Sequence, residues 1–443
     1  MSTNARLAPV RGGTGDAIDD GSIRVDTRRY RDPAYARAEN DLLWKKVWQV
    51  ACRAERIANF GDFHEYAIAG SSVFVVRDSE TTVKAYINAC PHRATQLAVG
   101  QGSFGSGQIV CPYHGWRWNL DGSRPTVYAE RGFPNGCLQA SDKELHAIKA
   151  DMRWGWVWIN FDPDAPPLET ALGRLVDEPV DSLRLEEARL VWHRYVELPS
   201  DWKFAVEGFL EAYHVTQTHP ALAFYRDYNP DSRMYEIDPY WGHGWTDRSE
   251  GVGTGGSAVE GVGMGEFLVA MNRMLAEGLQ SHLTDAQLAL QDDILASGVS
   301  LDDFPAEFFR RVEDEARTRG VEPPPRAAQH IFMFPNITFL SAFGNTLVYQ
   351  GRPHPDDPTR CILDIYSMSL APKDAEPTVP PREGPVALED CPWVMQQDFE
   401  NISRQRAGVR SPEVSHVVFS PIYETLNLNL HRVLDRYVGT PED

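Results

Sequence analysis

Residues 90–116 constrain this chain more than any other part of the sequence. They open with Cys-Pro-His-Arg and close with Cys-Pro-Tyr-His-Gly-Trp, and a glycine-rich spacer lies between. In each of these two short motifs a cysteine precedes a histidine, and a proline that restricts the backbone follows the cysteine directly. Two loops of this kind offer two thiolates and two imidazoles, so the fold has to bring the two loops together.

Two cysteines and two histidines are the ligand set of a Rieske [2Fe–2S] centre, in which two histidines replace two cysteines on one iron and raise the reduction potential. The predicted ligands are Cys90, His92, Cys111 and His114, and each loop supplies one ligand to each iron. A structural zinc site accepts the same residue types, and a disulfide between the two cysteines is a third interpretation. The order of the ligands and the two prolines favour the Rieske centre, which predicts electron transfer.

Composition narrows the class of protein. A chain of 443 residues is long enough for two or three domains. Its formal net charge of -20 repels phosphate backbones, so we expect no nucleic-acid partner. Residues 1–26 hold no apolar stretch of signal-peptide length, and no later run is long enough to span a bilayer. We therefore expect a soluble, cytoplasmic protein without a membrane partner.

Periodicity divides the chain into three parts. Apolar residues recur at helical spacing over 35–48, which predicts an entry helix after a polar arm. Residues 50–161 have strand character and predict a small all-β domain, which a proline-rich segment ends. Beyond it, strands and helices are set apart, which predicts an α+β domain with an antiparallel sheet. The predicted domains are 1–42 (arm and entry helix), 43–165 (Rieske domain) and 166–443 (catalytic domain).

The same patterns give individual elements. Strands are predicted over 73–76, 84–88, 153–160, 189–197, 330–343, 346–351 and 361–370, and helices over 202–213, 265–278, 285–296, 305–318, 392–407 and 422–438. Gly251, Gly253 and Gly256 formally satisfy the dinucleotide pattern G-x-G-x-x-G, but a polar sequence precedes them where an apolar strand is required. They predict a flexible loop, so the reducing equivalents have to come from another protein.

A second constellation lies in the sequence WKFAVEGFLEAYHVTQTHP, which carries Glu207, Glu211, His214 and His219. The spacing of the first three predicts one shared helix face. His219 lies roughly 140° further round an ideal helix, so both imidazoles reach one metal only if the helix loosens. Pro220 disfavours helical geometry at His219 and supplies that break. A metal site and two ordinary histidines fit this spacing equally well.

A ferrous site of two histidines and one carboxylate would leave three coordination positions for dioxygen and substrate. The chain contains 63 acidic residues, so spacing cannot select the third ligand. Asp398 is one candidate, because it lies in a predicted helix in line with Val394 and Ile402. The alternative is a solvent-facing acid.

Together these motifs resemble the terminal oxygenase (α) subunit of the Rieske non-haem iron aromatic-ring-hydroxylating oxygenases, from about residue 28 to the C-terminus. The resemblance implies an all-β Rieske domain followed by a helix-grip catalytic domain whose antiparallel sheet encloses an iron pocket. Asp398 is placed by the run D-x-x-x-x-x-x-Q-x-x-G, which continues through Gln405 to Gly408. The implied ligands are Cys90, His92, Cys111 and His114 for the cluster, and His214, His219 and Asp398 for mononuclear Fe(II).

The resemblance also implies partners. Such subunits form head-to-tail homotrimers, in some cases with a small β subunit, and receive electrons from a ferredoxin or a flavin reductase. An acid, here Glu211, joins the cluster histidine His114 of one chain to the iron histidine His214 of the next. The usual acid is Asp, and Gly208 stands where Asn is frequent. In having Glu at the bridging position, the chain resembles the branch of the family that oxidises quaternary ammonium compounds such as carnitine and betaine.

The predicted function is that of an oxygenase component that hydroxylates an apolar, aromatic substrate with O2. The alternative is N- or O-demethylation of a quaternary ammonium compound or a methyl ether. A pure electron carrier or a zinc hydrolase would explain only one of the two constellations. A cationic substrate would favour an aromatic cage, for which Tyr240, Trp241 and Trp245 are candidates. The side chains expected either to line the pocket or to be plain core are Phe204, Phe209, Leu210, Met333, Phe334, Phe339 and Phe343.

Overall fold

The computed structural model describes residues 23–176, 180–220, 227–228, 235–246, 256–257, 263–326, 328–357, 359–377 and 379–439. Contacts between residues divide the chain into two compact units. One unit comprises Asn40–Ala171 and Glu376–Val379, and the other comprises Met1–Glu39, Leu172–Ala375 and Pro380–Asp443. The boundaries at residues 42 and 165, which the sequence predicts for the Rieske domain, stay a prediction.

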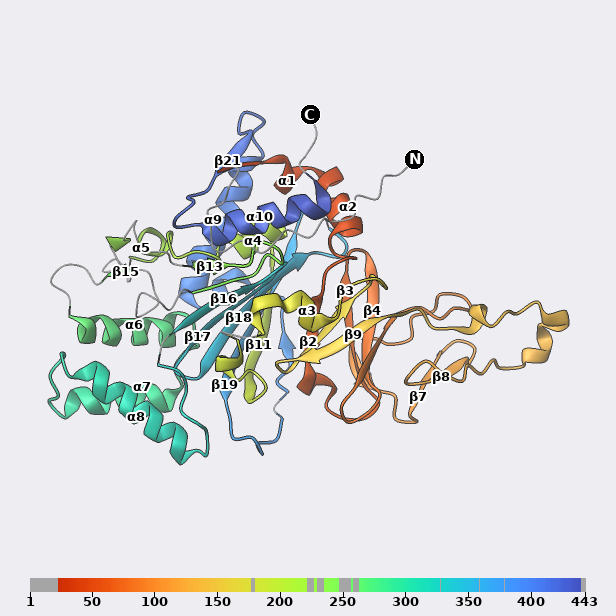
Figure 1. The fold of residues 1–443 in the computed structure, drawn as a ribbon, viewed down its shortest axis with the longest axis horizontal. Helices are drawn as coiled ribbons and strands as arrows, with labels where there is room; N and C mark the ends of the chain where they lie inside the picture. Colours follow the sequence, from red (N-terminus) through yellow and green to blue (C-terminus); the bar gives the residue numbers. More distant parts are fainter. Residues whose placement is uncertain are drawn as a thin grey trace. The chain divides into compact units, whose positions relative to one another are not determined.

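The smaller unit is built on an antiparallel sheet, as the alternating sequence pattern predicts. Seven strands pair in the order β2-β10-β9-β5-β4-β3-β6. A separate two-stranded hairpin, β7–β8, lies in the same unit (Figure 1). The strands are β2 Gln49–Arg53, β3 Asp62–Ile68, β4 Ser71–Arg77, β5 Val83–Ile87, β6 Gln101–Ser103, β7 Gln108–Val110, β8 Arg117–Asn119, β9 Ala147–Arg153 and β10 Trp156–Asn160.

The larger unit contains an eight-stranded sheet in the order β13-β14-β16-β17-β18-β19-β11-β20. All neighbours in it are antiparallel except β11 and β20. The α+β prediction is therefore confirmed. The strands are β11 Ala188–Leu198, β13 Tyr235–Ile237, β14 Gly244–Thr246, β16 Gln329–Met333, β17 Ile337–Ala342, β18 Asn345–Pro353, β19 Cys361–Leu370 and β20 Arg382–Glu383.

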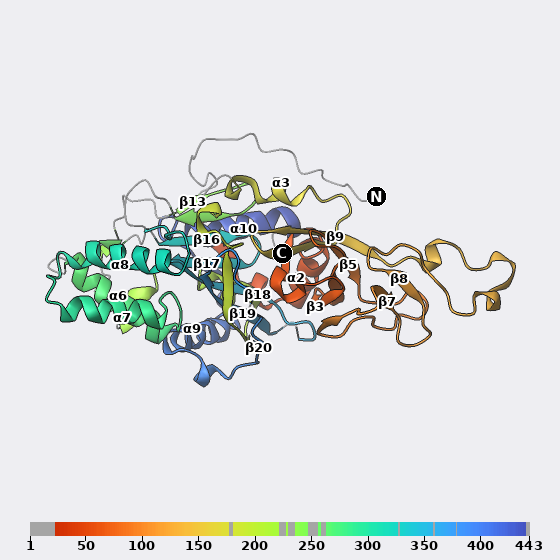
Figure 2. The ribbon, with the colours of Figure 1, turned by 90° about the horizontal axis from the view of Figure 1, so that it is seen from below.

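Two sets of helices in the larger unit lie next to the eight-stranded sheet. Helix α4 packs on β18 and β19 and against α9, whereas α6, α7 and α8 contact one another at one end of the sheet (Figures 1 and 2). Among the described residues, none of the helices has the length and apolarity needed to cross a membrane. The helices are α1 Arg28–Arg31, α2 Pro33–Leu42, α4 Trp202–Glu207, α5 Val215–Thr218, α6 Met264–Gly278, α7 Asp285–Ala296, α8 Phe304–Thr318, α9 Trp393–Val409 and α10 Thr425–Val438.

One predicted strand is two strands in the structure. The apolar run 330–343 forms β16 and β17, which pair antiparallel and leave residues 334–336 as the turn between them. Pro335 lies in this turn, and a proline cannot donate a backbone hydrogen bond to a sheet ladder.

The predicted helix over 202–213 is wrong in its second half. Helix α4 ends at Glu207, and the backbone N–H of Phe209 donates to the carbonyl of Val206 in a tighter turn. The Glu211 side chain accepts the backbone N–H of His214 at 3.0 Å. Such local side-chain bonds compete with helix formation. Glu207 and Glu211 therefore do not share a helix face.

Buried charged groups hold α4 in place. The Lys203 ammonium lies 2.7 Å from a Glu39 carboxylate oxygen and 2.9 Å from one of Asp201. One turn later, Glu207 Oε1 accepts the Tyr30 hydroxyl at 3.0 Å and lies 2.9 Å from His431 Nε2. Burial raises the pKa of Glu207 to about 8. The helix that leads into the second constellation is thus fixed by polar contacts to both ends of the chain.

The raised pKa of Glu207 predicts a pH-dependent stability. The folded protein keeps this proton up to about pH 8, whereas the unfolded chain releases it near an ordinary glutamate pKa of about 4.3. The free energy of unfolding should therefore fall as pH rises between those values, by up to about 1.4 kcal/mol per pH unit. Glu207→Gln removes this pH dependence. The melting temperature of the variant minus that of wild type should therefore increase between pH 5 and pH 8. The melting temperature of the exposed control Glu400→Gln should follow that of wild type at every pH. If the melting temperature of Glu207→Gln also changed with pH in parallel with wild type, the raised pKa of Glu207 would be contradicted.

Candidate metal centres and substrate cavity

The first candidate centre lies on two tight loops of the smaller unit. Cys90 follows β5, and its carbonyl accepts the backbone N–H of Ala94 at 2.8 Å. Cys111 follows β7, and its carbonyl accepts the N–H of Gly115 at 3.1 Å. Gly115 has a φ of +69°, a conformation that favours glycine, so this loop can turn back into β8.

The four predicted ligands converge. The rings of His92 and His114 have centroids 4.7 Å apart and planes inclined by 70°. Cys90 and Cys111 are buried free thiols that interact with each other, and burial raises the pKa of Cys90 to about 11. His114 Nδ1 is buried and has no hydrogen-bond partner among the described residues. An imidazole nitrogen without a partner, on a loop next to the paired thiols, fits a Rieske cluster, because its lone pair is available to bind iron.

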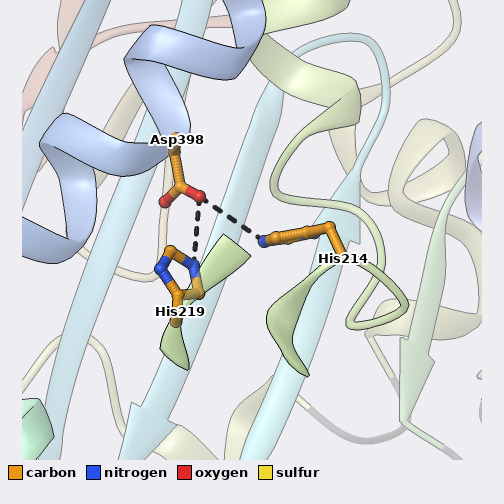
Figure 3. Close-up of side chains that lie close together, drawn as sticks. All are labelled: His214, His219 and Asp398. Atoms are coloured by element: carbon orange, nitrogen blue, oxygen red, sulfur yellow. Dashed lines mark ion pairs between the residues drawn. The ribbon is translucent and has the colours of Figure 1, made fainter. Parts of the chain in front are cut away.

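The second candidate centre joins three side chains from two parts of the larger unit. His214 and His219 flank the short helix α5, and Asp398 projects from α9 (Figure 3). Asp398 Oδ1 lies 3.1 Å from His219 Nε2 and 3.5 Å from His214 Nε2. One donor atom of each residue lies within 4.8 Å of the others. The predicted triad is thus brought together, and its donor set is that of a non-haem iron site.

Two further side chains orient the imidazoles. His214 Nδ1–H donates to Glu211 Oε1 at 2.6 Å, and His219 Nδ1–H donates to Gln397 Oε1 at 2.7 Å. Each contact leaves the Nε2 lone pair directed at the shared site, as is common for metal-binding histidines. Burial lowers the pKa of His214, but the Glu211 carboxylate outweighs burial and raises that pKa to about 9. A proton therefore has to leave His214 when a metal binds.

Gln397 was not predicted from the sequence. Its position next to Asp398 was the only available signal, and a glutamine beside an acid is too common to single out. We expect Gln397→Leu to lower the affinity for Fe(II) by about 10- to 100-fold, the usual effect of losing a side chain that orients a ligand. Metal titration of the iron-free protein measures this. Gln396→Leu is the matched control, because the Gln396 side chain donates to the carbonyls of Glu389 and Cys391 and not to an imidazole of the triad. An equal loss in both variants would contradict the role.

A cavity of about 300 Å³ adjoins the triad. Its polar wall includes Glu211 and the three triad residues. The remaining wall is mostly apolar and is built by α6, α8 and the β17–β18 turn, with Phe267, Met271, Leu275, Phe309 and Phe343. A cavity of this size and lining suits a small organic molecule.

The predicted pocket residues are confirmed only in part. Of the seven, Phe209 and Phe343 line the cavity. The other five, namely Phe204, Leu210, Met333, Phe334 and Phe339, are buried elsewhere in the core. Spacing identified buried side chains but not the face of the sheet on which they lie.

The predicted aromatic cage does not form at the cavity. Tyr240, Trp241 and Trp245 are not among its lining residues. Trp245 pairs with Ile331, the neighbour of the cavity residue His330, so strand alternation directs it to the opposite face of the sheet. There its ring lies 4.8 Å from the Arg174 guanidinium.

The glycine-rich segment was predicted to be a flexible loop. Gly251 and Gly253 lie outside the described residues. Gly256 begins the two-residue strand β15 (Gly256–Ser257), which pairs with β12 (Asp227–Tyr228).

Comparison with known families matches both halves of the chain. Residues 47–134 match the model of the Rieske [2Fe-2S] domain, which favours the cluster over a zinc site. Residues 185–440 match the model of the ring hydroxylating alpha subunit (catalytic domain). The resemblance inferred from the motifs is thereby confirmed.

Individual relatives and structures agree. The chain is 30% identical over 227 residues to the carnitine monooxygenase oxygenase subunit of Escherichia coli K12, which covers 50% of this chain and 57% of that protein. It is 27% identical over 208 residues to the biphenyl 2,3-dioxygenase subunit alpha of Rhodococcus jostii, covering 46% and 45%. The chain thus spans about half the length of these relatives. A quaternary ammonium Rieske monooxygenase crystallised with L-carnitine has the same fold, with a TM-score of 0.63, 14% identity and coverage of 94% and 95%.

Proposed function

Since this chain belongs to the ring-hydroxylating alpha-subunit family and contains a Rieske [2Fe-2S] domain, we propose that it is the terminal component of a multicomponent oxygenase. It hydroxylates a small, largely apolar organic substrate with O2. A separate ferredoxin or flavin reductase supplies the electrons. The observation that carries this proposal is the junction of the His214–His219–Asp398 triad with an apolar cavity of about 300 Å³.

In this proposal the predicted ligands keep their roles. His214, His219 and Asp398 hold Fe(II), and the two loops hold the Rieske cluster through Cys90, His92, Cys111 and His114. When bound, the cluster supplies single electrons and the ferrous ion supplies a centre for O2 reduction. The apolar wall excludes water and positions the substrate carbon to be attacked.

Glu211 has two tasks in the proposed assembly. Within its own chain it holds the Nδ1 proton of His214. In a head-to-tail trimer it also binds His114 of a neighbouring copy and links the two centres. Its carboxylate is then the group that can exchange a proton with either imidazole as their charges change.

A second substrate class has its own support. By its name, the carnitine monooxygenase relative acts on carnitine, which is a quaternary ammonium compound. With Glu211 at the bridging position, the chain is similar to the branch of the family that oxidises such compounds. Demethylation of such a compound is therefore the alternative activity. The lining favours the first class, because the two carboxylates that it contains within the described part of the chain, Glu211 and Asp398, are engaged with the histidines.

Oxygen consumption tests the proposed function. The purified protein is loaded with iron and sulfide and supplied with a generic ferredoxin–reductase pair. It is then given arenes, methyl ethers and quaternary amines in turn. We expect substrate-dependent O2 uptake with formation of a hydroxylated product from at least one apolar substrate. Uptake with quaternary amines alone would support the alternative, and a protein that binds both iron centres but never consumes O2 would refute both.

A further inference from the structure

Tyr349 brings a phenol ring into the cavity wall next to the second constellation. It lies on β18, and its side chain lines the cavity. Its ring stacks on that of Phe209, with centroids 3.8 Å apart and planes inclined by 8°. Phe209 lines the same cavity and precedes Glu211 by two residues. The strand backbone and the stacked ring leave Tyr349 little freedom, so the position of its hydroxyl is set before a ligand binds.

The hydroxyl of Tyr349 is a donor that a ligand can reach. It forms no hydrogen bond with any described residue, and unlike the unpaired hydroxyl of Tyr35 it is not enclosed by protein atoms. Burial raises the pKa of Tyr349 well above its usual value, and the nearby Asp398 carboxylate adds to this shift. The hydroxyl therefore stays protonated close to the triad and can donate a hydrogen bond into the cavity.

Most other polar side chains of the lining are closed to a ligand. Four of them are already hydrogen-bonded within the protein, namely Tyr235, Thr246, His330 and Ser341. Three more have unpaired atoms that other protein atoms enclose, namely Asn272, His282 and Gln329. A ligand in the cavity therefore cannot use the unpaired atoms of these three side chains.

Arg326 is a second donor that a ligand can reach, but it belongs to the solvent side of the cavity. Its side chain is 61% exposed, and its Nε donates to Glu313 Oε1 at 2.6 Å. The guanidinium lies 5.9 Å from the centre of the Phe309 ring of α8. A solvated charge that is already paired adds little binding free energy. Apart from the proposed metal site, Tyr349 is thus the polar group that can orient a ligand inside the cavity.

We propose that the Tyr349 hydroxyl donates a hydrogen bond to an oxygen acceptor of the substrate, a carbonyl or an ether oxygen on an otherwise apolar skeleton. This inference rests on the proposed function and deepens it by naming the substrate class. The mostly apolar wall disfavours a charged group, and a buried hydroxyl without a partner costs free energy that an acceptor on the ligand would remove. Aryl methyl ethers and ketones belong to this class, whereas a trimethylammonium group has no lone pair to offer. Tyr349 acts here as a specificity determinant and not in the chemical step.

Binding to the iron-loaded enzyme without reductant tests this in the absence of turnover. Two matched pairs of probes differ in one oxygen: acetophenone with α-methylstyrene, and anisole with ethylbenzene. Dissociation constants are measured by calorimetry, and their ratio, oxygen-free probe over oxygen-bearing probe, is compared between variants, which cancels the difference in hydration of the probes. We expect Tyr349→Phe to lower this ratio by about three- to tenfold, the usual value of one hydrogen bond.

Two features of the design make the result specific. Tyr349→Phe removes no hydrogen bond with a described residue and keeps the ring that stacks on Phe209, so the variant should fold as wild type does. Tyr235→Phe is the matched control, because it removes a hydroxyl from the same lining that already lies 2.9 Å from His330 Nδ1, and it should leave the ratio unchanged.

Three results would overturn the inference: a wild-type ratio in Tyr349→Phe, an equal fall in both variants, or no binding of either oxygen-bearing probe. If O2 uptake were absent although Tyr349→Phe showed the expected fall in the ratio, the proposed oxygenase function would be refuted and the binding role of Tyr349 would stand.

Discussion

Asp398→Ala should reduce O2-dependent turnover by at least about a hundredfold while the Rieske absorption stays at its wild-type intensity. Losing an outer partner of a metal ligand already costs about 10- to 100-fold, and Asp398 is proposed as a ligand itself. Its Oδ1 lies 3.1 Å from His219 Nε2 and 3.5 Å from His214 Nε2. The cluster loops belong to a different compact unit, so they should load normally.

The measurement combines iron content, the visible spectrum and O2 uptake. We expect the variant to lose one iron per chain and to keep the two irons of the cluster. Glu400→Ala is the matched control, because Glu400 lies on the same helix, its side chain is 63% exposed, and it forms an ion pair with Arg404. Turnover that survives in Asp398→Ala would show that another acid completes the site.

Glu211→Ala should separate the two centres. With enough Fe(II) present to offset the weaker binding expected when an orienting side chain is lost, both metals should stay bound while turnover falls by about a hundredfold or more. Glu211 Oε1 is 2.6 Å from His214 Nδ1, and Oε2 accepts the His214 backbone N–H. Alanine removes both contacts. It also removes the carboxylate that raises the pKa of His214.

Rapid mixing of the reduced variant with substrate and O2 would locate the defect. We expect oxidation of the cluster to slow in parallel with product formation. Glu211→Asp keeps the charge with a shorter side chain and should restore a large part of the rate. Fast oxidation of the cluster in Glu211→Ala would remove Glu211 from the path between the centres.

Patterns with a fixed chemical meaning predicted the Rieske unit well. The cysteine–histidine loops and the alternating strands around them match the Rieske unit, because ligand spacing in a tight loop is set locally. Helices such as α7 and strands such as β19 were also predicted at their observed bounds, because their periodicity is regular. The motif D-x-x-x-x-x-x-Q-x-x-G of the resembling family, and not periodicity, selected Asp398 from the 63 acidic residues.

Long-range contacts explain what the sequence could not predict. The helix predicted over 202–213 ends early because the Glu211 carboxylate accepts the backbone N–H of His214. Helical spacing of apolar residues does not indicate such a contact. Gln397 matters only because the fold brings His219 to it. The aromatic cage failed because Trp245 lies on the far side of the sheet, and the strand register that decides this is set by Ile331, far along the chain.

The α6–α8 group carries a consequence for how such an enzyme changes over time. Phe304 and Phe308 of α8, Ile294 of α7 and Phe343 of the β17–β18 turn give this group a hydrophobic cluster of its own. It meets α9 closely at Gly278, where an added Cβ would lie 2.6 Å from Val394. Mutations in the α6–α8 group away from this contact can therefore accumulate without touching the proposed ligands on α9 and around α5. New substrates become accessible to selection while the redox machinery is inherited intact.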